Sequence, residues 1–550
     1  CPFTNFCMLQ IKSEEDEEVE IEIKEDEELH NPDPYDFVYS NIPKNTHVFK
    51  TEENCRFCKA TKFKYESKRL CCKKGQIRLA NPDTPPELMR LWTSNDSEGR
   101  HFRNNIRFFN GHFSFTTLYC HVDRDTTDIR TTGIYTFRAH GQIYHNIHSF
   151  GNSRSDPKHL ELYFYDDDPS LEHRYRHYRE AMYEQDRQVI GIITDILRDN
   201  PYSQQFRSLG QAQNLEDYRL ILNLDQRLDQ RTYNAPINSE VAAVWIEGNE
   251  RRNTYDRNVI LHGNNNEIEH IRSYYGCYDP LSYPLFFPRA ELGWHRKIPK
   301  KDTQEEDVGA ENINNDEDPD SVSGLWVTMR EYYCYKFHTR PNIFNPILHG
   351  GRLFQQFAVD TYIKIESSRL DYMWHHQNKI RADLYQGLLD NIQAGEQNGD
   401  AVGKRRVLTS SFIGGPRDKL RRYLDAMALV RKYGKPDVFL TMTCNPNWEE
   451  ITRELQFRQT PQDCPDIVVR VFRAKLEEMK QLFEKAILGK LIMTGKYKYT
   501  CPEQYDRIIS AELPDKHKYP ELYKMVVKHM MHGPCGALNK FCPCTKNRPS

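Results

Sequence analysis

Two long acidic runs limit which parts of this chain can fold into a core. The first is SEEDEEVEIEIKEDEEL at residues 13–29, and the second lies within residues 302–320. Such runs repel themselves and carry little apolar surface, so they are typical of solvated tails and linkers. The sequence therefore predicts a disordered acidic leader over residues 1–50 and an acidic linker over residues 301–324.

The rest of the chain has enough apolar material for several domains. The 550 residues are 38% hydrophobic, and the net charge of -3 hides a basic body once the acidic runs are set aside. A basic body fits a nucleic-acid binder. No stretch of about 18 apolar residues occurs, so no membrane partner is expected. The start has Cys1 in place of Met and no signal-peptide pattern, which we interpret as an N-terminal fragment.

Residues 97–300 contain short runs with strand-like composition. FSFTTLYCHV at 113–122 and HLELYFYD at 159–166 are rich in aromatic and β-branched residues, which favours strands. A helix is expected around residues 179–197, where apolar residues recur at helical spacing. We therefore predict a mixed, β-rich N-terminal domain here.

Residues 325–550 show a mainly helical pattern around one short strand. Apolar residues at steps of three and four predict helices over 352–393, 416–433 and 466–489. The run VFLTMTCNP at 438–446 predicts a strand that ends at its Asn-Pro. The fold class expected for the whole chain is α+β and multi-domain.

Four cysteines have the spacing of metal ligands: Cys55, Cys58, Cys71 and Cys72. A C-x2-C turn lets two thiolates take adjacent corners of a tetrahedron around Zn²⁺. Adjacent cysteines are a poorer chelating pair, so His47 or His101 could replace one of them. The intervening KATKFKYESKRL is basic and aromatic, which suits nucleic-acid contact. We predict a structural zinc knuckle over residues 51–96, with free thiols in a small hairpin as the alternative.

A second set with ligand-like spacing lies near the end of the sequence: His532, Cys535, Cys542 and Cys544. A DNA-binding set flanks the Gly414-Gly415 turn: Lys404, Arg405, Arg406, Arg417, Lys419, Arg421 and Arg422. Glycines let the backbone approach a phosphate, and the basic side chains neutralise it. The alternative for this set is a solvated helix face.

A third basic set lies beside an aromatic run near residue 335. Lys336, His338 and Arg340 stand close in sequence to the tyrosines of REYYCYKFHTR at 330–340. Stacking on tyrosine rings would suit single-stranded bases. Burial of these rings in a core is the alternative.

Several phrases, in the same order, resemble the N-terminal half of Helitron-type rolling-circle transposases. They span residues from about 55 to 550 and include CRFC…CCKKGQIRL (55–79), GIYTFRAHGQIYH (133–145), DPLSYPLFFPRAELGWH (279–295), LHGGRLFQQFAVDTYIKIESSRLDY (348–372), VFLTMTCNPNWEEI (438–451) and MHGPCG (531–536). The resemblance implies a nuclear, DNA-binding transposable-element protein. It also implies an initiator domain that nicks DNA with a tyrosine and an ATP-dependent helicase.

The resemblance further implies a His-x-His pair on a strand, holding Mg²⁺ or Mn²⁺, because residues two apart face the same side. Among the 21 histidines of this chain no two are separated by a single residue. The interval that should hold the pair is only LIMTGKYKYTCPEQYDRI at 491–508. We therefore expect an incomplete initiator-type sheet within 325–550, poor order over residues 489–506, and no Mg²⁺ or Mn²⁺ site.

The other catalytic parts implied by the resemblance are also missing from this sequence. The family tyrosines would follow MHGPCG, past residue 550, whereas Tyr497 and Tyr499 precede it. In GKLIMTGKY at 489–497 a tyrosine follows the lysine where a phosphate loop needs Ser or Thr, so no ATP site is expected. The family's strand motif remains, in which Thr441, Thr443 and Asn445 could support a phosphate or cap a turn.

These observations favour a DNA-binding remnant of a Helitron transposase, without nickase or helicase activity in these residues. One alternative is a truncated gene product of an active nickase-helicase. Another is a host protein that has adopted the sequence and binds DNA or a protein partner. Single-stranded DNA is the expected ligand in each DNA-binding case.

Overall fold

The computed structural model describes these parts of the chain: residues 47–122, 139–148, 159–175, 183–211, 218–222, 242–246, 259–262, 268–271, 274–296, 298–301, 303, 325–377, 407–434, 442–455, 459–482 and 513–529. Most of the predicted acidic leader and acidic linker lies outside these ranges, as do residues 489–506. These three predictions therefore remain predictions.

Short helices dominate the N-terminal part of the described chain. They are α1 (Pro86–Thr93), α2 (Ser97–Asn104), α3 (Ile106–Phe113), α6 (Glu172–Tyr175), α7 (Tyr183–Leu197) and α8 (Pro201–Gly210), with the 3-10 helices η2 (Lys73–Gly75) and η3 (His159–Tyr165). Local signals start them: the Asn200 side chain accepts hydrogen bonds from the backbone amides of Tyr202 and Ser203, and Pro201 fits the first turn of α8.

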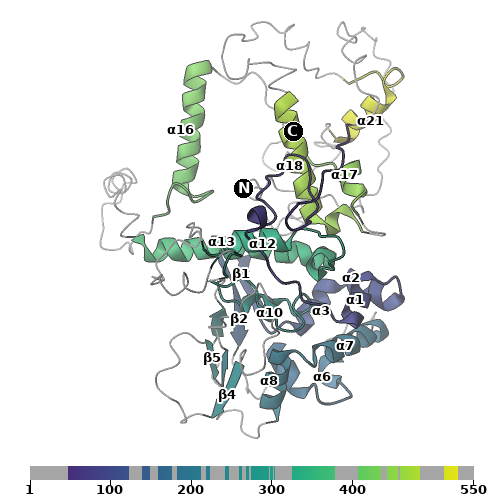
Figure 1. Cartoon of the computed structure of the whole chain (residues 1–550), viewed down its shortest axis with the longest axis vertical. Coiled ribbons are helices and arrows are strands. Elements are labelled where there is room, and N and C mark those ends of the chain that lie inside the picture. Colours follow the sequence, from purple (N-terminus) through teal and green to yellow (C-terminus); the bar gives the residue numbers. More distant parts are fainter. Residues whose placement is uncertain are drawn as a thin grey trace, which may run out of the picture.

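Both long and short helices follow, with α13 at the centre of the molecule. They are α10 (Tyr278–Ser282), α12 (Met329–Lys336), α13 (Gly351–His375), α16 (Pro416–Tyr433), α17 (Glu449–Thr452), α18 (Pro465–Leu482) and α21 (Pro520–His529), with η6 (Pro346–His349) and η8 (Pro461–Asp463). Figure 1 shows α13 crossing between the N-terminal helices and the group α16, α17, α18 and α21. Among the described helices, none combines the length and apolar character needed to span a bilayer.

The helices predicted from apolar spacing are present where the structure describes them. The prediction for 416–433 coincides with α16, because proline opens this helix and Gly434, with φ of 87°, ends it. The helix α13 begins at Gly351, one residue before the predicted start, and ends at His375, whereas residues 378–393 lie outside the described ranges.

The prediction of a β-rich N-terminal region is wrong. Within the described residues, strands form only two small antiparallel sheets, β1-β2-β6 and β4-β3-β5, and the core is helical. The six strands are β1 (Thr117–Val122), β2 (Ala139–His148), β3 (Tyr218–Leu222), β4 (Ala242–Ile246), β5 (Val259–His262) and β6 (Ile268–Ile271). Aromatic content misled the sequence prediction, because aromatic side chains fill the spaces between helices equally well.

Two segments show how this happened. The run HLELYFYD, expected as a strand, begins with the 3-10 helix η3. In FSFTTLYCHV the first residue, Phe113, ends helix α3, whereas Thr117–Val122 forms strand β1 as expected. Their rings pack in a helical core: Tyr163 stacks on Phe115 with ring centroids 4.4 Å apart, and Phe115 contacts Phe206 of α8 at 5.2 Å. The ring contacts, not strand pairing, position these residues.

The prediction of an initiator-type sheet in residues 325–550 is also wrong for the part of the chain that the structure describes. All six strands precede residue 272, and later described residues form helices, turns and isolated bridges. Residues 442–446, expected as the end of a strand, have no regular structure, and residues 438–441 lie outside the described ranges.

A buried polar network joins the segment at 274–296 to α12 and α13. Lys364 Nζ lies 2.6 Å from Asp279 Oδ1, and Tyr333 donates to Asp279 Oδ2 at 2.7 Å. Asp360 accepts hydrogen bonds from the hydroxyls of Tyr278 and Tyr283. Each charge is satisfied by a partner, as burial requires. This network fixes one face of α13 against the residues that precede α12.

Candidate metal centre

The first cysteine pair lies on a tight turn. The backbone amide of Lys59 donates to the carbonyl of Cys55 at 2.8 Å, and the amide of Cys55 donates to the carbonyl of Ala60 at 2.8 Å. Lys59 takes a left-handed conformation, with φ of 59°. The C-x2-C spacing therefore closes into a turn that directs Cys55 and Cys58 to the same side.

The second pair precedes a turn of three left-handed residues. Lys73, Lys74 and Gly75 have φ of 47°, 59° and 89°. Left-handed lysines are strained, and such strain persists only where the surroundings fix it. The turn brings the amide of Gly75 to 3.2 Å from the Cys72 sulfur, a contact that stabilises a thiolate.

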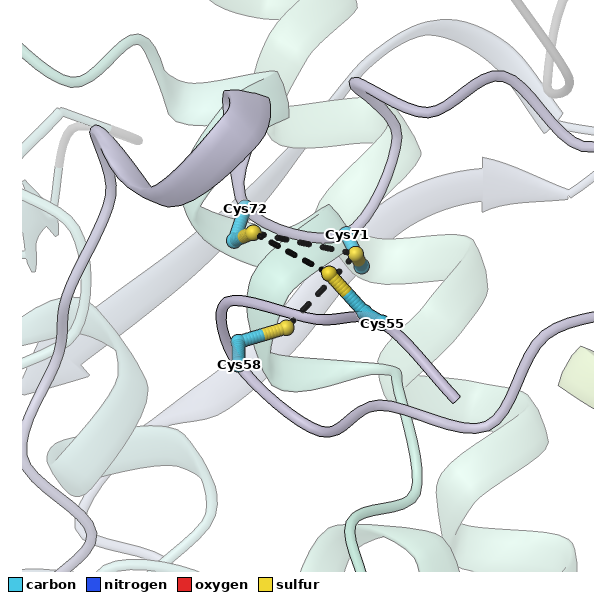
Figure 2. Close-up of side chains that lie close together, drawn as sticks. All are labelled: Cys55, Cys58, Cys71 and Cys72. Atoms are coloured by element: carbon cyan, nitrogen blue, oxygen red, sulfur yellow. Dashed lines mark hydrogen bonds between the residues drawn. The ribbon is translucent and has the colours of Figure 1, made fainter. Parts of the chain in front are cut away.

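The four sulfurs converge on one point between these turns. Figure 2 shows Cys55 and Cys58 facing the neighbouring Cys71 and Cys72, with the sulfurs directed toward one another. The Sγ–Sγ distances are 3.7 Å for Cys55–Cys72, 3.6 Å for Cys58–Cys71 and 3.8 Å for Cys71–Cys72. A tetrahedral site with Zn–S bonds of about 2.3 Å has sulfur–sulfur edges of about 3.8 Å. The four cysteines could therefore hold a metal ion such as zinc.

A buried cation lies close to this sulfur cluster. The Arg340 side chain is buried, with 6% of its surface exposed, and its Nη2 lies 3.9 Å from Cys58 Sγ. Its guanidinium also stacks over the Tyr335 ring, 3.7 Å from the centroid. Four thiolates around Zn²⁺ carry two net negative charges, so a buried cation is a suitable neighbour.

The cluster also shifts the pKa of its own thiols. Hydrogen bonding with Cys71, and next with Cys72, lowers the pKa of Cys58. Hydrogen bonding with Cys58 raises the pKa of Cys71 and raises that of Cys72 to about 11. Among Cys58, Cys71 and Cys72 the thiolate is thus favoured on Cys58, and a bound cation would favour ionisation of the other two.

The two histidines considered as replacement ligands lie elsewhere. His101 Nε2 lies 2.7 Å from Asp186 Oδ1, and His47 packs edge-on against the Phe49 ring. Adjacent cysteines were expected to be a poor chelating pair. Here the backbone of Cys72, with φ of -155° and ψ of 18°, lets both Cys71 and Cys72 reach the cluster. The predicted cysteine set is therefore the one that the structure brings together.

The sulfur-bearing turns, residues 55–78, which we call the knuckle, are packed against distant helices. Arg470 of α18 donates to the Glu66 carboxylate at 2.5 Å and to the Thr61 carbonyl at 2.7 Å. Lys73 pairs with Glu331 of α12 at 2.6 Å. The knuckle thus contacts α12 and α18 directly.

The helix α18 and all but the first three residues of α12 lie in the segment for which a family match exists. Residues 332–501 match the family described as the Helitron helicase-like domain at the N-terminus. This segment is a Helitron helicase-like domain. The match confirms, for these residues, the resemblance to Helitron-type transposases that the sequence motifs predicted. A comparison with curated proteins finds no match to the chain.

Within the Helitron-like domain, the predicted DNA-binding set lies at the start of α16, except Lys404, Arg405 and Arg406, which lie outside the described residues. Asp418, itself buried, pairs with Arg421 at 2.8 Å and Arg422 at 2.9 Å. The Asp418 carboxylate also accepts from the Gly414 amide at 3.0 Å. The glycine turn therefore already has an anion in the place expected for phosphate.

The family strand motif of the Helitron-like domain lies partly outside the described residues, since Thr441 is not among them. Asn445 Oδ1 accepts from the backbone amide of Asn447 at 2.9 Å, which is the turn-capping alternative. The second predicted metal set, His532, Cys535, Cys542 and Cys544, lies outside the described residues as well.

The tyrosines near residue 335, which were predicted to stack on bases, are buried in the hydrophobic core. The rings of Tyr332, Tyr333 and Tyr335 are at most 5% exposed, and His338 is 4% exposed. No base could reach them without unfolding α12. By contrast, Phe57 of the knuckle is 63% exposed, and the sequence prediction did not single it out. The basic sequence around it was the available signal.

Proposed function

We propose that this Helitron-type chain binds single-stranded DNA through the exposed face of a zinc knuckle, and that these 550 residues neither nick nor unwind it. The supporting observation is a solvent-exposed aromatic ring on the same two turns as three exposed cations that have no carboxylate partner among the described residues. We define the knuckle face as Arg56, Phe57, Lys59 and Lys74, all of them exposed.

The knuckle face is built across both cysteine turns. The Phe57 ring lies over Gly75, where an added Cβ would come within 3.0 Å of the ring. Arg56 and Lys59 flank the ring on its own turn, and Lys74 precedes Gly75 on the other. The glycine is needed here because it combines a positive φ with this close approach.

The charges of the knuckle face are available to an anion. Lys64 and Lys73, elsewhere on the knuckle, pair with Glu478 at 2.9 Å and Glu331 at 2.6 Å. No carboxylate in the described part of the chain lies within ion-pair distance of Arg56, Lys59 or Lys74. Cations that stay unpaired beside an exposed ring are what a nucleic-acid strand would use.

The chemistry of the face favours a single strand with little sequence preference. An exposed phenyl ring stacks on any unpaired base, and the cations contact phosphates. The zinc would be structural, holding the two turns in register, and none of the four cysteines leaves a ligand position for chemistry. Because its ligand would be DNA, we propose that the protein acts in the nucleus.

The proposed lack of catalysis is supported by the sequence. A Helitron nickase needs two imidazoles on one metal, and the chain has no His-x-His pair. The test for this part is incubation of the chain with supercoiled and single-stranded DNA in Mg²⁺ or Mn²⁺. A protein-linked DNA product would contradict it.

Fluorescence anisotropy with a labelled single-stranded oligonucleotide tests the binding. We expect the triple variant Arg56→Gln, Lys59→Gln, Lys74→Gln to reduce the slope of log affinity against log salt by about 2, at about 0.7 for each phosphate contact. Phe57→Ala should weaken binding by about 5-fold to 150-fold, the range for one lost stacking contact. Zinc content should be unchanged in both.

The matched control is a double variant at the start of α16, Arg417→Gln and Lys419→Gln. We expect this change to affect binding less than the knuckle variants do, because Asp418 already supplies negative charge at that turn. If the α16 variant loses as much DNA affinity as the knuckle variants, or more, the binding site lies at α16 and the assignment to the knuckle face is wrong.

A further inference from the structure

The segment that follows the second cysteine turn presents one more exposed cation. Its side chains alternate between exposed and buried positions: Gln76 and Arg78 are exposed, whereas Ile77 and Leu79 are each 3% exposed. This alternation is that of an extended segment with one face packed on the core. The two buried residues therefore hold Arg78 at the surface.

The backbone that carries Arg78 is fixed by distant parts of the chain. The Tyr335 hydroxyl of α12 donates to the Leu79 carbonyl at 3.3 Å. The Lys301 amide donates to the Gln76 carbonyl at 2.8 Å, which brings a second exposed cation beside the segment. Both cations stand on backbone that is ordered before a ligand arrives, so less entropy is lost there on binding.

Neither cation is neutralised by a carboxylate. In the parts of the chain that the structure describes, no Asp or Glu lies within ion-pair distance of Arg78 or Lys301. The neighbouring Lys73 and Lys300 differ, because Glu331 lies 2.6 Å and 3.9 Å from their Nζ atoms. Two exposed cations without carboxylate partners are suited to contact phosphate.

These cations are continuous with the knuckle face. The Phe57 ring lies over Gly75. Gln76 is the next residue along the chain, and its carbonyl accepts the hydrogen bond from Lys301. A strand that stacks a base on Phe57 can therefore pass directly from the knuckle face to the second pair of cations.

The backbone limits the distance between the two groups of cations. Lys74 of the knuckle face and Arg78 are four residues apart, so their Cα atoms lie at most about 14 Å apart. One strand of B-DNA carries a phosphate about every 3.4 Å. The distance thus corresponds to at most about four nucleotides of a stacked strand.

We propose that Arg78 and Lys301 form a second phosphate-contacting site, so that the protein selects single strands long enough to cover both this site and the knuckle face. The inference rests on the proposed DNA binding of the knuckle face, and it adds a length requirement to that binding. A base stacks on Phe57 while phosphates farther along the strand contact Arg78 and Lys301. A shorter strand engages only one of the two sites.

Fluorescence anisotropy of the full chain with labelled oligothymidines of about 3 and about 12 nucleotides, shorter and longer than this distance, tests the inference. We expect the double variant Arg78→Gln, Lys301→Gln to reduce the slope of log affinity against log salt by about 1.4 for the long strand, at about 0.7 for each phosphate contact. The slope for the short strand, which is held at Phe57, should be unchanged.

Two controls separate a phosphate contact from a general effect of charge. Arg198→Gln with Lys480→Gln removes the same charge from side chains that are 54% and 53% exposed outside the knuckle, and should leave both slopes unchanged. Arg78→Lys keeps the charge and should keep the slope for the long strand. Zinc content should be the same in all variants.

The two proposals fail in different ways. If the parent chain binds neither strand, the proposed function fails and the inference fails with it. If Phe57→Ala weakens binding but the Arg78 and Lys301 double variant leaves the long-strand slope unchanged, the inference fails alone. It also fails alone if the double variant changes both strands equally, or no more than the distant control does.

Discussion

The Arg470 guanidinium of α18 and the Glu66 carboxylate of the knuckle form an ion pair at 2.5 Å, although 404 residues separate them in sequence. Both side chains are less than 10% exposed. The same guanidinium lies over the Phe63 ring at 4.7 Å from its centroid. The pair therefore fixes the knuckle to the Helitron-like domain.

Replacing Arg470 with Met should strongly destabilise the fold. The change leaves the buried Glu66 carboxylate with only the more distant Lys62, at 3.9 Å, as a charged partner, which costs up to about 3–5 kcal/mol of unfolding free energy. Urea unfolding followed by tryptophan fluorescence measures this. Lys480→Ala is the control, because its pair with Glu477 is more exposed, at 53% and 33%, and its loss should cost about 1 kcal/mol or less.

A second prediction concerns the boundary of the Helitron-like domain. Lys364 of α13 pairs with Asp279, and both are almost fully buried. A fragment that starts at residue 325 would lack Asp279 and expose that face of α13. We expect the fragment to be unfolded by circular dichroism and a fragment of residues 47–529 to fold. A cooperative thermal transition in the shorter fragment would contradict the role of the network.

The features that could be predicted from the sequence are those fixed by interactions between residues close together in the chain. The cysteine spacing predicted the quartet, because a C-x2-C turn is fixed by its own backbone hydrogen bonds. Proline and glycine at its ends predicted α16. The β-rich prediction failed because aromatic residues such as Phe115 and Tyr163 favour strands by composition and pack between helices by tertiary contact. The pairing of Glu66 with Arg470 has no local signal at all.

A third prediction concerns pH. Burial raises the pKa of Glu291 to about 7 from its ordinary 4.5. Between these values the folded chain keeps a proton that the unfolded chain has lost, so raising the pH over this window destabilises the fold. The difference in unfolding free energy between Glu291→Gln and the parent should therefore grow from pH 4.5 to about 7. A constant difference would mean that Glu291 is ionised when folded.

Metal affinity should fall as the pH falls. Zinc must displace the protons of the thiols, and in the metal-free cluster the pKa of Cys72 is raised to about 11. We expect the apparent zinc affinity to drop by more than about tenfold per pH unit between pH 7 and pH 5, since each site releases more than one proton. Competition with a chromophoric chelator measures it. Affinity that does not vary with pH would exclude thiolate ligands.

The most direct test of the zinc knuckle measures zinc content and single-stranded DNA affinity in the same samples of the parent chain and of Cys55→Ser. The account predicts that Cys55→Ser holds less zinc and binds DNA at least about tenfold more weakly, because the two turns that build the knuckle face lose their common ligand. Cys277→Ser, a buried cysteine outside the cluster, should change neither. Unchanged DNA affinity in a Cys55→Ser sample that has lost its zinc would contradict the account.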